Sequence, residues 1–241
     1  MKKIWVCDFD GTLYRNNDKC SFCKALDYLY GLRENGGEFI VASGRPLHLL
    51  EPFFDRFGET YFISCDGALF SKGFETLKSF PIDKGKIKKI TEKTKLQYVL
   101  TGASISYVHC RDAALKMRLC EFYNGHAVGI ENPSEAEGMI YKAAFFGEHR
   151  EFGGLEKCWN SYGIHEYTAE GVSKGKCLLY AREYLGFSKE NTFAAGDGQN
   201  DVSMFETAFK SYAMCSAPPS VKQRADIVAA DINDAFDERQ G

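Results

Sequence analysis

Two acidic residues stand two positions apart in the segment Asp8-Phe9-Asp10-Gly11-Thr12-Leu13, directly after the apolar run Ile4–Cys7. If that run is a strand, side chains two apart point the same way, so the carboxyl groups of Asp8 and Asp10 can meet one ligand. Carboxylates this close repel each other, and a divalent cation is the usual way to keep at least one ionised. Gly11 would let the backbone turn tightly past the site. The alternative is a plain strand-to-turn junction, in which Asp and Gly serve only as turn residues.

A second polar corner, Ser43-Gly44-Arg45, follows the apolar run Phe39–Ala42, where a strand is expected to give way to a helix. The hydroxyl of Ser43 and the N–H groups after it would then face a pocket. Free N–H groups at a helix N-terminus favour anions, so this corner predicts an anion site. Alternatively, Ser43 is only the N-cap of the helix.

Lys174 lies between Ser173 and Gly175, where the helical pattern that includes Cys177–Leu185 begins. A cation at a helix start is unfavourable for the helix dipole, which indicates that Lys174 has an anion to meet. Alternatively, it is a solvated surface lysine, as most lysines are. A Walker phosphate loop is excluded because Glu170 and Cys177 occupy positions at which that motif needs Gly and Ser or Thr.

A third pair of acids follows the apolar run Thr192–Ala195 in Gly196-Asp197-Gly198-Gln199-Asn200-Asp201. Asp197 at the strand end can reach a metal, and Asp201, one helical turn later, can orient water or the first acid. Asp and Asn are also common at plain helix starts, which is the alternative. The glycines on either side of Asp197 favour the metal site, because they permit close approach of backbone and ligand.

The elements that must position these residues follow one pattern. Short apolar runs that do not alternate predict strands covered on both faces, and helical patterns such as Phe22–Leu32 and Leu47–Phe57 lie between them. Strands alternating with helices predict an α/β fold with a doubly wound, Rossmann-like parallel sheet. Ligands bind such sheets beyond the carboxyl ends of the strands, and every polar corner described above falls there.

The alternation breaks between about Pro81 and Thr168. We expect an inserted α+β domain there, with crossings near Phe80-Pro81 and Glu170-Gly171. The patterns in this stretch predict helices at Lys84–Lys95, Ala113–Tyr123 and Leu155–Tyr162, and strands at Tyr98–Leu100, Ser104–His109 and Met139–Phe146.

The four motifs, in this order, resemble motifs I to IV of the haloacid dehalogenase (HAD) superfamily, most of whose members are phosphatases. The forms V-x-S-G-R, G-V-S-K-G and G-D-G-x-N-D, with a long insertion between motifs II and III, are similar to the Cof-type branch, which carries a C2-type cap. The resemblance implies a core domain of residues 1–80 and 169–241 and a cap domain of residues 81–168.

The resemblance also implies roles for single residues. Asp8 would be the nucleophile that forms an aspartyl-phosphate, and Asp10 the acid and then the base. The phosphate-binding residues would be Ser43, Gly44 and Lys174, and Mg2+ would be bound by Asp8, the Asp10 backbone carbonyl and Asp197, with Asn200 and Asp201 in support. The expected function is a Mg2+-dependent phosphatase for a small phosphorylated metabolite, such as a sugar phosphate or cofactor phosphate.

Two other functions share these motifs. A phosphotransferase or phosphomutase similar to phosphomannomutase would pass the phosphoryl group to a second hydroxyl, and a non-catalytic HAD-like binding module would have lost the chemistry. One departure bears on the substrate: Cof-type proteins usually have Asn-Gly after the third strand, where this chain has Cys65-Asp66-Gly67. If Asp66 touches the substrate, its charge would disfavour anionic leaving groups.

Composition excludes other classes. The 30 Lys and Arg residues nearly balance 33 Asp and Glu, giving a net charge of −3, which argues against nucleic acid and anionic membrane surfaces as partners. No apolar stretch approaches the roughly 20 residues that cross a bilayer, and no signal peptide is recognised. The nine cysteines are then expected to be reduced and mostly buried in a cytoplasmic protein, with Cys20 and Cys23 packed as small hydrophobes. The oligomeric state is not predicted.

Overall fold

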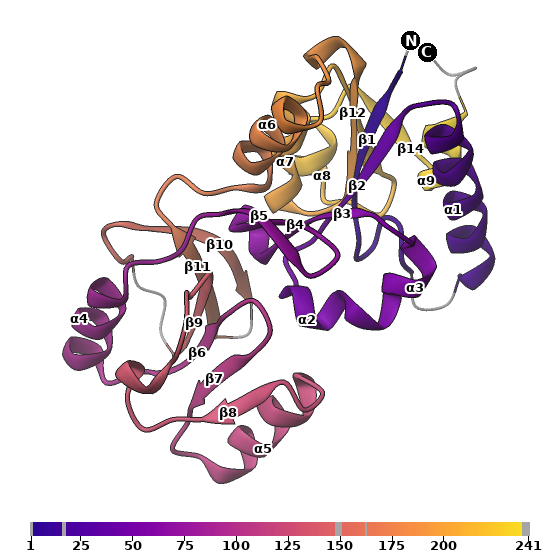
Figure 1. The fold of residues 1–241 in the computed structure, drawn as a ribbon. Helices are drawn as coiled ribbons and strands as arrows, with labels where there is room; N and C mark the ends of the chain where they lie inside the picture. The colour runs from indigo at the N-terminus through magenta and orange to yellow at the C-terminus, as the bar shows by residue number, and fades with distance from the viewer. Residues whose placement is uncertain (1, 16–17, 148–150, 162, 238–241) are drawn as a thin grey trace.

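The computed structural model describes residues 2–15, 18–147, 151–161 and 163–237 and contains two β-sheets (Figure 1). The first sheet has eight strands in the order β14-β13-β12-β1-β2-β3-β4-β5. All neighbours from β14 to β3 are parallel, and β4 and β5 add an antiparallel edge. Its strands are β1 (Ile4–Asp8), β2 (Glu38–Ala42), β3 (Tyr61–Ser64), β4 (Leu69–Lys72), β5 (Glu75–Ser79), β12 (Thr192–Gly196), β13 (Lys210–Met214) and β14 (Ile227–Ala229).

Helices cover both faces of this sheet, as the doubly wound prediction requires. On β1, Trp5 and Cys7 belong to the core cluster that includes α1 (Lys19–Glu34) and α9 (Ile232–Phe236). The alternate residues Ile4 and Val6 pack on the opposite face, with α6 (Lys174–Tyr184), α7 (Val202–Thr207) and α8 (Pro219–Lys222). Since successive strand side chains point to opposite faces, two helical layers explain why β1 is apolar without alternation. The α/β prediction is confirmed.

One predicted helix of this region is divided. Residues 47–57 form α2 (Leu47–Leu50), a 3-10 turn at Glu51–Phe53 and α3 (Phe54–Phe57). Pro52 stands in the turn, and because it has no N–H to donate, an uninterrupted α-helix is disfavoured there.

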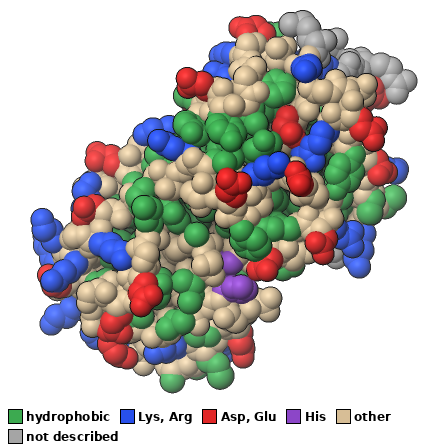
Figure 2. Space-filling model, viewed as in Figure 1, with side chains coloured by type: hydrophobic (Ala, Val, Ile, Leu, Met, Phe, Trp, Pro, Cys, Tyr) green, Lys and Arg blue, Asp and Glu red, His purple; other side chains and the backbone are tan. Residues whose placement is uncertain are grey.

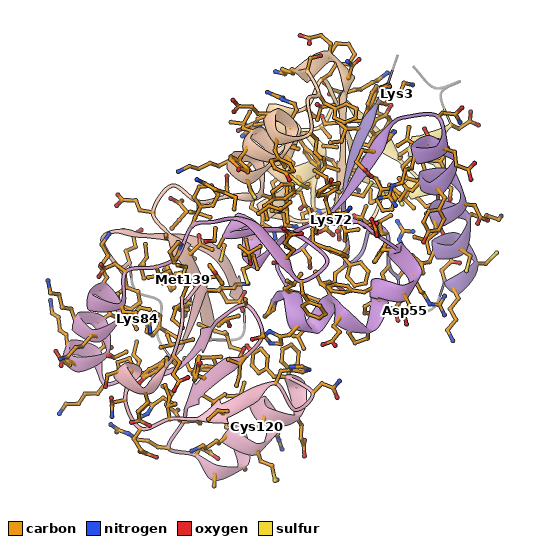
Figure 3. The ribbon with its side chains drawn as sticks, viewed as in Figure 1. Lys3, Asp55, Lys72, Lys84, Cys120 and Met139 are labelled. Carbon is orange, nitrogen blue, oxygen red and sulfur yellow. The ribbon has the colours of Figure 1, made fainter. Side chains whose placement is uncertain are left out.

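The second sheet has six strands in the order β10-β11-β9-β6-β7-β8 and lies in the inserted region. Its pairs are antiparallel except for β7 and β8, and α4 (Lys84–Thr94) and α5 (Ala113–Phe122) accompany it. Figure 3 shows Lys84 on α4 and Cys120 on α5 at separate places around this sheet. Its strands are β6 (Gln97–Thr101), β7 (Ser106–His109), β8 (Ala127–Gly129), β9 (Lys142–Phe146), β10 (Leu155–Ser161) and β11 (Ile164–Ala169).

The predicted helix at 155–162 is wrong. Residues Leu155–Ser161 form β10, which pairs antiparallel with β11 through a turn at Gly163, while Tyr162 lies outside the described residues. Gly163 has φ +74°, a conformation that glycine adopts without strain. Pairing with a neighbouring strand, which a local pattern does not contain, decided the structure of this segment.

The predicted boundaries of the insertion stay a prediction. The second sheet falls within residues 81–168 except for Ala169, the last residue of β11. The chain leaves the first sheet after β5 and returns to it after β11, so the two sheets are joined by two crossings (Figure 1). The second sheet therefore lies opposite the carboxyl ends of β1, β2 and β12.

Two surface properties accompany the fold. Among the described residues, no helix is long and apolar enough to span a membrane. Acidic and basic side chains are interspersed over the face seen in Figure 2, without a broad region of one sign.

The nine cysteines are all free, but only Cys7, Cys65 and Cys177 are buried, so the expectation that most are buried is wrong. Cys20 and Cys23 are exposed on α1 and do not pack as core residues.

Candidate active site

Three charged groups from distant parts of the chain meet at the carboxyl end of β1. The Nζ atom of Lys174 lies 2.6 Å from Oδ1 of Asp8 and 2.6 Å from Oδ1 of Asp201. Lys174 is only 1% exposed and is the first residue of α6, whose N-cap is Ser173. The ammonium group therefore points into the protein between two acids, and the alternative of a solvated surface lysine is wrong.

Glycines make this approach of the backbone possible. A Cβ atom on Gly175 would lie 2.0 Å from the carbonyl oxygen of Ser203, and one on Gly67 would lie 2.2 Å from that of Ser173. Any larger residue at either position would push α6, and Lys174 with it, out of place. Packing therefore requires glycine at positions 67 and 175, in addition to the charged contacts that hold Lys174.

The electrostatics of this cluster are dominated by an excess of carboxylates. Oxygens of Asp8, Asp197 and Asp201 lie within 4.8 Å of one another, and Lys174 is the ammonium group between them. Burial and then the charge of Asp201 raise the pKa of Asp8 well above its usual value, although Lys174 opposes this. Burial and Asp201 likewise raise the pKa of Asp197. A further positive charge would relieve both shifts.

The donor set fits a hard divalent cation on one side of the cluster. Both oxygens of Asp201 already have partners, because its Oδ1 binds Lys174 and its Oδ2 accepts hydrogen bonds from the N–H groups of Asp197 (3.0 Å) and Gly198 (2.8 Å). Asp8 and Asp197 keep carboxylate oxygens for a cation, and such oxygens are the ligands that Mg2+ prefers. A Cβ atom on Gly11 would lie 2.4 Å from Oδ2 of Asp197, so the glycine makes room for this acid.

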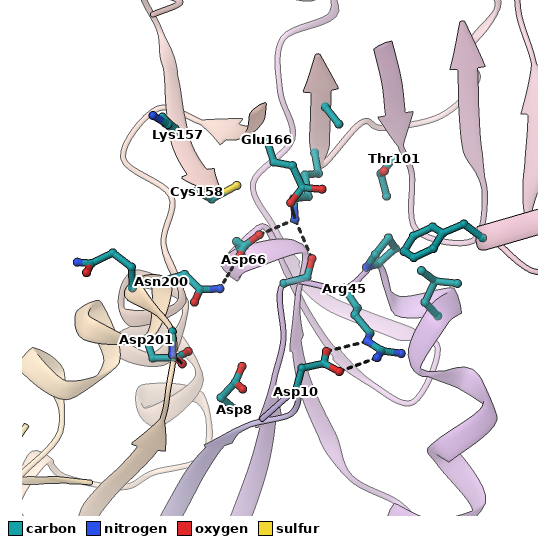
Figure 4. Close-up of a pocket in the computed structure, with 18 of the residues that line it drawn as sticks. Asp8, Asp10, Arg45, Asp66, Thr101, Lys157, Cys158, Glu166, Asn200 and Asp201 are labelled. Atoms are coloured by element: carbon teal, nitrogen blue, oxygen red, sulfur yellow. Dashed lines mark hydrogen bonds and ion pairs between the residues drawn. The ribbon is translucent and has the colours of Figure 1, made fainter. Parts of the chain in front are cut away.

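Asp10 lies at the edge of the cluster with its side chain turned elsewhere. Its two oxygens accept hydrogen bonds from Nε (2.7 Å) and Nη2 (2.5 Å) of Arg45, whose guanidinium stacks over the ring of Phe9. Figure 4 shows Asp10 directed towards Arg45 and away from Asp8. Its side chain is 47% exposed, so it borders the space into which a substrate would enter.

Ser43 and Gly44 follow the carboxyl end of β2. This strand pairs with β1, and its last residue, Ala42, stands beside Asp8. Ser43 is buried and its Oγ accepts a hydrogen bond from the N–H group of Arg45 at 3.0 Å. It is not the N-cap of α2, a position that Pro46 holds. A Cβ atom on Gly44 would lie 3.1 Å from Oδ1 of Asp66, which shows how closely this loop approaches the next one.

Sequence reasoning missed a second charged cluster, formed by Asp66, Lys142 and Glu166. Lys142 of β9 reaches from the second sheet and places Nζ 2.7 Å from Oδ2 of Asp66 and 2.9 Å from the carbonyl oxygen of Gly44. It also pairs with Oε2 of Glu166 on β11. Lys142 is thus engaged by two carboxylates and one carbonyl oxygen. Figure 4 shows this cluster facing the site across the junction of the two sheets.

The charge of Asp66 is compensated by these contacts. Burial alone would raise the pKa of Asp66, but Lys142 and then Lys174 outweigh it and hold that pKa at about 2. Asp66 and Glu166 in turn keep the pKa of Lys142 well above its usual value despite burial. Of this cluster the sequence had singled out Asp66 alone; a further signal was the lone lysine in the otherwise apolar segment Lys142–Phe146.

Asn200 belongs to this cluster more than to the first one. Its Nδ2 donates a hydrogen bond of 2.7 Å to Oδ1 of Asp66. The expected support of a metal by Asn200 is therefore indirect here, since the amide connects the loop after β12 to the one after β3. Asp201, by contrast, contacts Lys174 and the backbone of Asp197 directly.

A cavity of about 750 Å³ opens between the two clusters and the two sheets. Its volume suits a small metabolite. Asp8, Asp10, Gly44 and Arg45 lie at one end, and Asp66, Lys142 and Glu166 line it from the other side. Its remaining lining residues are Pro46, Leu49, Thr101, Phe122, Tyr123, Ala144, Lys157, Cys158, Gly198, Gln199, Asn200 and Asp201.

Comparison with known proteins agrees with this architecture. A model of haloacid dehalogenase-like hydrolases matches residues 5–235. The pyridoxal phosphate phosphatase YbhA of Escherichia coli is 28% identical, with 95% of this chain and 93% of that protein covered. A phosphoglycolate phosphatase of Staphylothermus marinus is 24% identical, with 95% and 91% covered.

Solved structures show the same fold. BT1666 of Bacteroides thetaiotaomicron, from a study of phosphatases of the HAD superfamily, superposes with a TM-score of 0.82 at 20% identity and covers 95% of this chain and 90% of its own. BT4131, a sugar phosphatase of HAD subclass IIB, superposes with a TM-score of 0.79 at 23% identity, with 99% and 97% covered.

Proposed function

The chain belongs to the haloacid dehalogenase-like hydrolase family, and we propose that it hydrolyses a phosphorylated metabolite with Mg2+ through an aspartyl-phosphate on Asp8. Its relatives over nearly the whole chain are phosphatases, so it is an enzyme that acts on small phosphorylated substrates. The observation that carries the covalent route is the buried Asp8 carboxylate, held by Lys174 at the end of a 750 Å³ cavity.

The first step needs a nucleophile, a proton donor and positive charge. Asp8 attacks phosphorus, the bond from phosphorus to the leaving oxygen breaks, and Asp10 gives that oxygen a proton. Lys174 stabilises the charge on the transferred group, and the hydroxyl of Ser43 and the N–H groups around Gly44 donate hydrogen bonds to its oxygens. The deep position of Asp8 and Lys174 makes these interactions stronger than they would be in water.

The second step regenerates the enzyme. Asp10, now ionised, takes a proton from water while the water oxygen attacks phosphorus, and the bond from phosphorus to Asp8 breaks. The guanidinium of Arg45 holds the carboxylate of Asp10 in a two-point contact. That contact must open for Asp10 to reach the leaving oxygen and the attacking water.

Mg2+ would be held by the carboxylates of Asp8 and Asp197 and the backbone carbonyl of Asp10. When bound, it supplies positive charge that offsets the repulsion between the acids and the phosphoryl oxygens. The role of Asp201 is to hold Lys174 and the backbone of Asp197 in place. Thr12, whose Oγ1 donates to Oδ1 of Asp197 at 3.2 Å, orients the same acid.

The substrate would be a sugar phosphate or a cofactor phosphate. The names of two relatives, pyridoxal phosphate phosphatase and sugar phosphatase, support these two classes. We place the reaction in the cytoplasm, as predicted from the sequence, where such metabolites are found.

The test is a panel of phosphorylated metabolites incubated with the protein in Mg2+ or in EDTA, with phosphate release as the readout. We expect release in Mg2+ without any bisphosphate activator, which separates a phosphatase from a phosphomutase. Acid quenching of a reaction with 32P-labelled substrate should leave base-labile label on the wild-type chain and none on the Asp8→Asn variant. A wild-type chain without label, or a variant that carries it, would refute the covalent route.

A further inference from the structure

The cavity holds a carboxylate that no cation fully compensates. Lys142 carries one positive charge, and it pairs with the carboxylates of both Asp66 and Glu166. Both acids line the cavity, but the side chain of Asp66 is only 2% exposed, whereas that of Glu166 is 24% exposed. The net charge of these three side chains is therefore −1. Glu166 is the member whose carboxylate is exposed to the cavity beside the proposed phosphoryl site.

The ammonium group of Lys142 is already engaged on three sides. It forms ion pairs with Asp66 and Glu166 and donates a hydrogen bond to the carbonyl oxygen of Gly44. A second anionic group on the substrate would have to displace one of these bonds and leave a carboxylate without its partner. Such a displacement is costly in a buried position.

Two other cations line the cavity. The guanidinium of Arg45 makes a two-point contact with the carboxylate of Asp10. Lys157 on β10 is exposed. Figure 4 shows its side chain pointing away from Asp66 and Glu166, on the far side of Cys158.

One wall of the same cavity is apolar. Pro46 and Leu49 come from the N-cap and the body of α2, and Tyr123 and Ala144 from the second sheet's side, with Phe122 at the exposed margin. Such a wall can cover the apolar face of a leaving group, while Glu166 accepts a hydrogen bond from its hydroxyl or ammonium groups.

We propose that Glu166 selects phosphate monoesters of neutral or cationic alcohols and rejects those whose leaving group carries a second negative charge. The proposal rests on the proposed phosphatase function and goes further, because it sets apart two classes of phosphate ester that the same chemistry could cleave. The sequence suggested Asp66 as the acid that discriminates between substrates, but Asp66 is paired with Lys142. In this proposal Glu166 of β11, in the second sheet, discriminates instead.

Two substrates of nearly equal size and opposite charge test this. Phosphoethanolamine ends in an ammonium group where phosphoglycolate ends in a carboxylate. We expect the wild-type kcat/KM to be at least about tenfold higher for phosphoethanolamine, and Glu166→Gln to reduce that ratio by about tenfold, as the loss of one charge at short range would do. A merely structural role of Glu166 would lower both rates together and leave the ratio unchanged.

Controls separate this inference from the proposed function. Glu137→Gln makes the same chemical change at an exposed acid that does not line the cavity, and it should keep the wild-type ratio. Phenyl phosphate reports phosphatase activity without a second charge, and no release from it or from any metabolite of the panel would refute the proposed function itself. Activity on phenyl phosphate together with a wild-type preference for phosphoglycolate would refute only the role of Glu166. So would a larger change of the ratio in Lys157→Gln than in Glu166→Gln.

Discussion

Each of the two clusters of the molecule places one lysine among acids, three acids in the first and two in the second, and their charge balances differ. Around Asp8, the acids Asp197 and Asp201 outnumber Lys174, and the pKa of Asp8 is raised. Around Asp66, the ammonium groups of Lys142 and Lys174 prevail, and its pKa falls to about 2. The first cluster thus lacks positive charge and fits a cation and a phosphoryl group. The second stabilises the junction of the two sheets and leaves only Glu166 partly uncompensated.

The largest effect should come from changing the proposed nucleophile of the first cluster. Asp8→Asn would remove the attacking oxygen of the proposed mechanism, and we expect kcat to fall by at least about 10⁴-fold, as for other covalent nucleophiles. The fold should persist, because the neutral amide relieves repulsion with Asp201 in a buried site. Phosphate release and the melting temperature Tm check the two expectations together.

The matched control is Asp55→Asn, the same change at an exposed acid of α3 (Figure 3). It should keep wild-type turnover and Tm. An Asp8→Asn variant that turns over within about tenfold of the wild type would contradict the nucleophile assignment.

Breaking the second cluster should affect stability first. Lys142→Met leaves Asp66 and Glu166 without their shared cation, and we expect a loss of about 3 kcal/mol in the free energy of unfolding. Adding Asp66→Asn removes one of the stranded charges and should restore about 2 kcal/mol of it. Urea unfolding of the single and double variants measures the coupling. Purely additive losses would mean that the two side chains do not stabilise each other.

The contrast between the clusters also explains what the sequence could and could not predict. Asp8, Lys174 and Asp197 follow strands of one parallel sheet or begin its helices, so local patterns and the rule for strand ends place them at one edge. Lys142 and Glu166 reach the site only because β9 and β11 pair and face the first sheet. Local sequence does not contain that pairing, and the same gap made Leu155–Ser161 look helical when it is a strand.

Binding of Mg2+, measured through Tm, distinguishes the two clusters without an activity assay. At a concentration of about 100 times its Kd, it should stabilise the wild-type chain by about 2.7 kcal/mol, seen as a rise in Tm over the EDTA sample. Asp197→Asn removes the negative charge of a proposed ligand and should abolish most of this rise. Glu166→Gln should keep it, because the Lys142 ammonium group already lies among the acids of the second cluster. Equal losses in both variants would place the cation elsewhere.

The smallest effect we expect is a pH dependence that belongs to Asp66. Its pKa in the folded chain is about 2, below the ordinary value of 3.8, so its stabilising contribution is complete above about pH 4 and is lost as the pH falls towards 2. The shift corresponds to about 2 kcal/mol. The difference in unfolding free energy between the wild type and Asp66→Asn should therefore shrink by about this amount between pH 4 and pH 2, while Asp55→Asn follows the wild type throughout. A difference that stays constant over this range would show that Lys142 does not hold Asp66 in its ionised form.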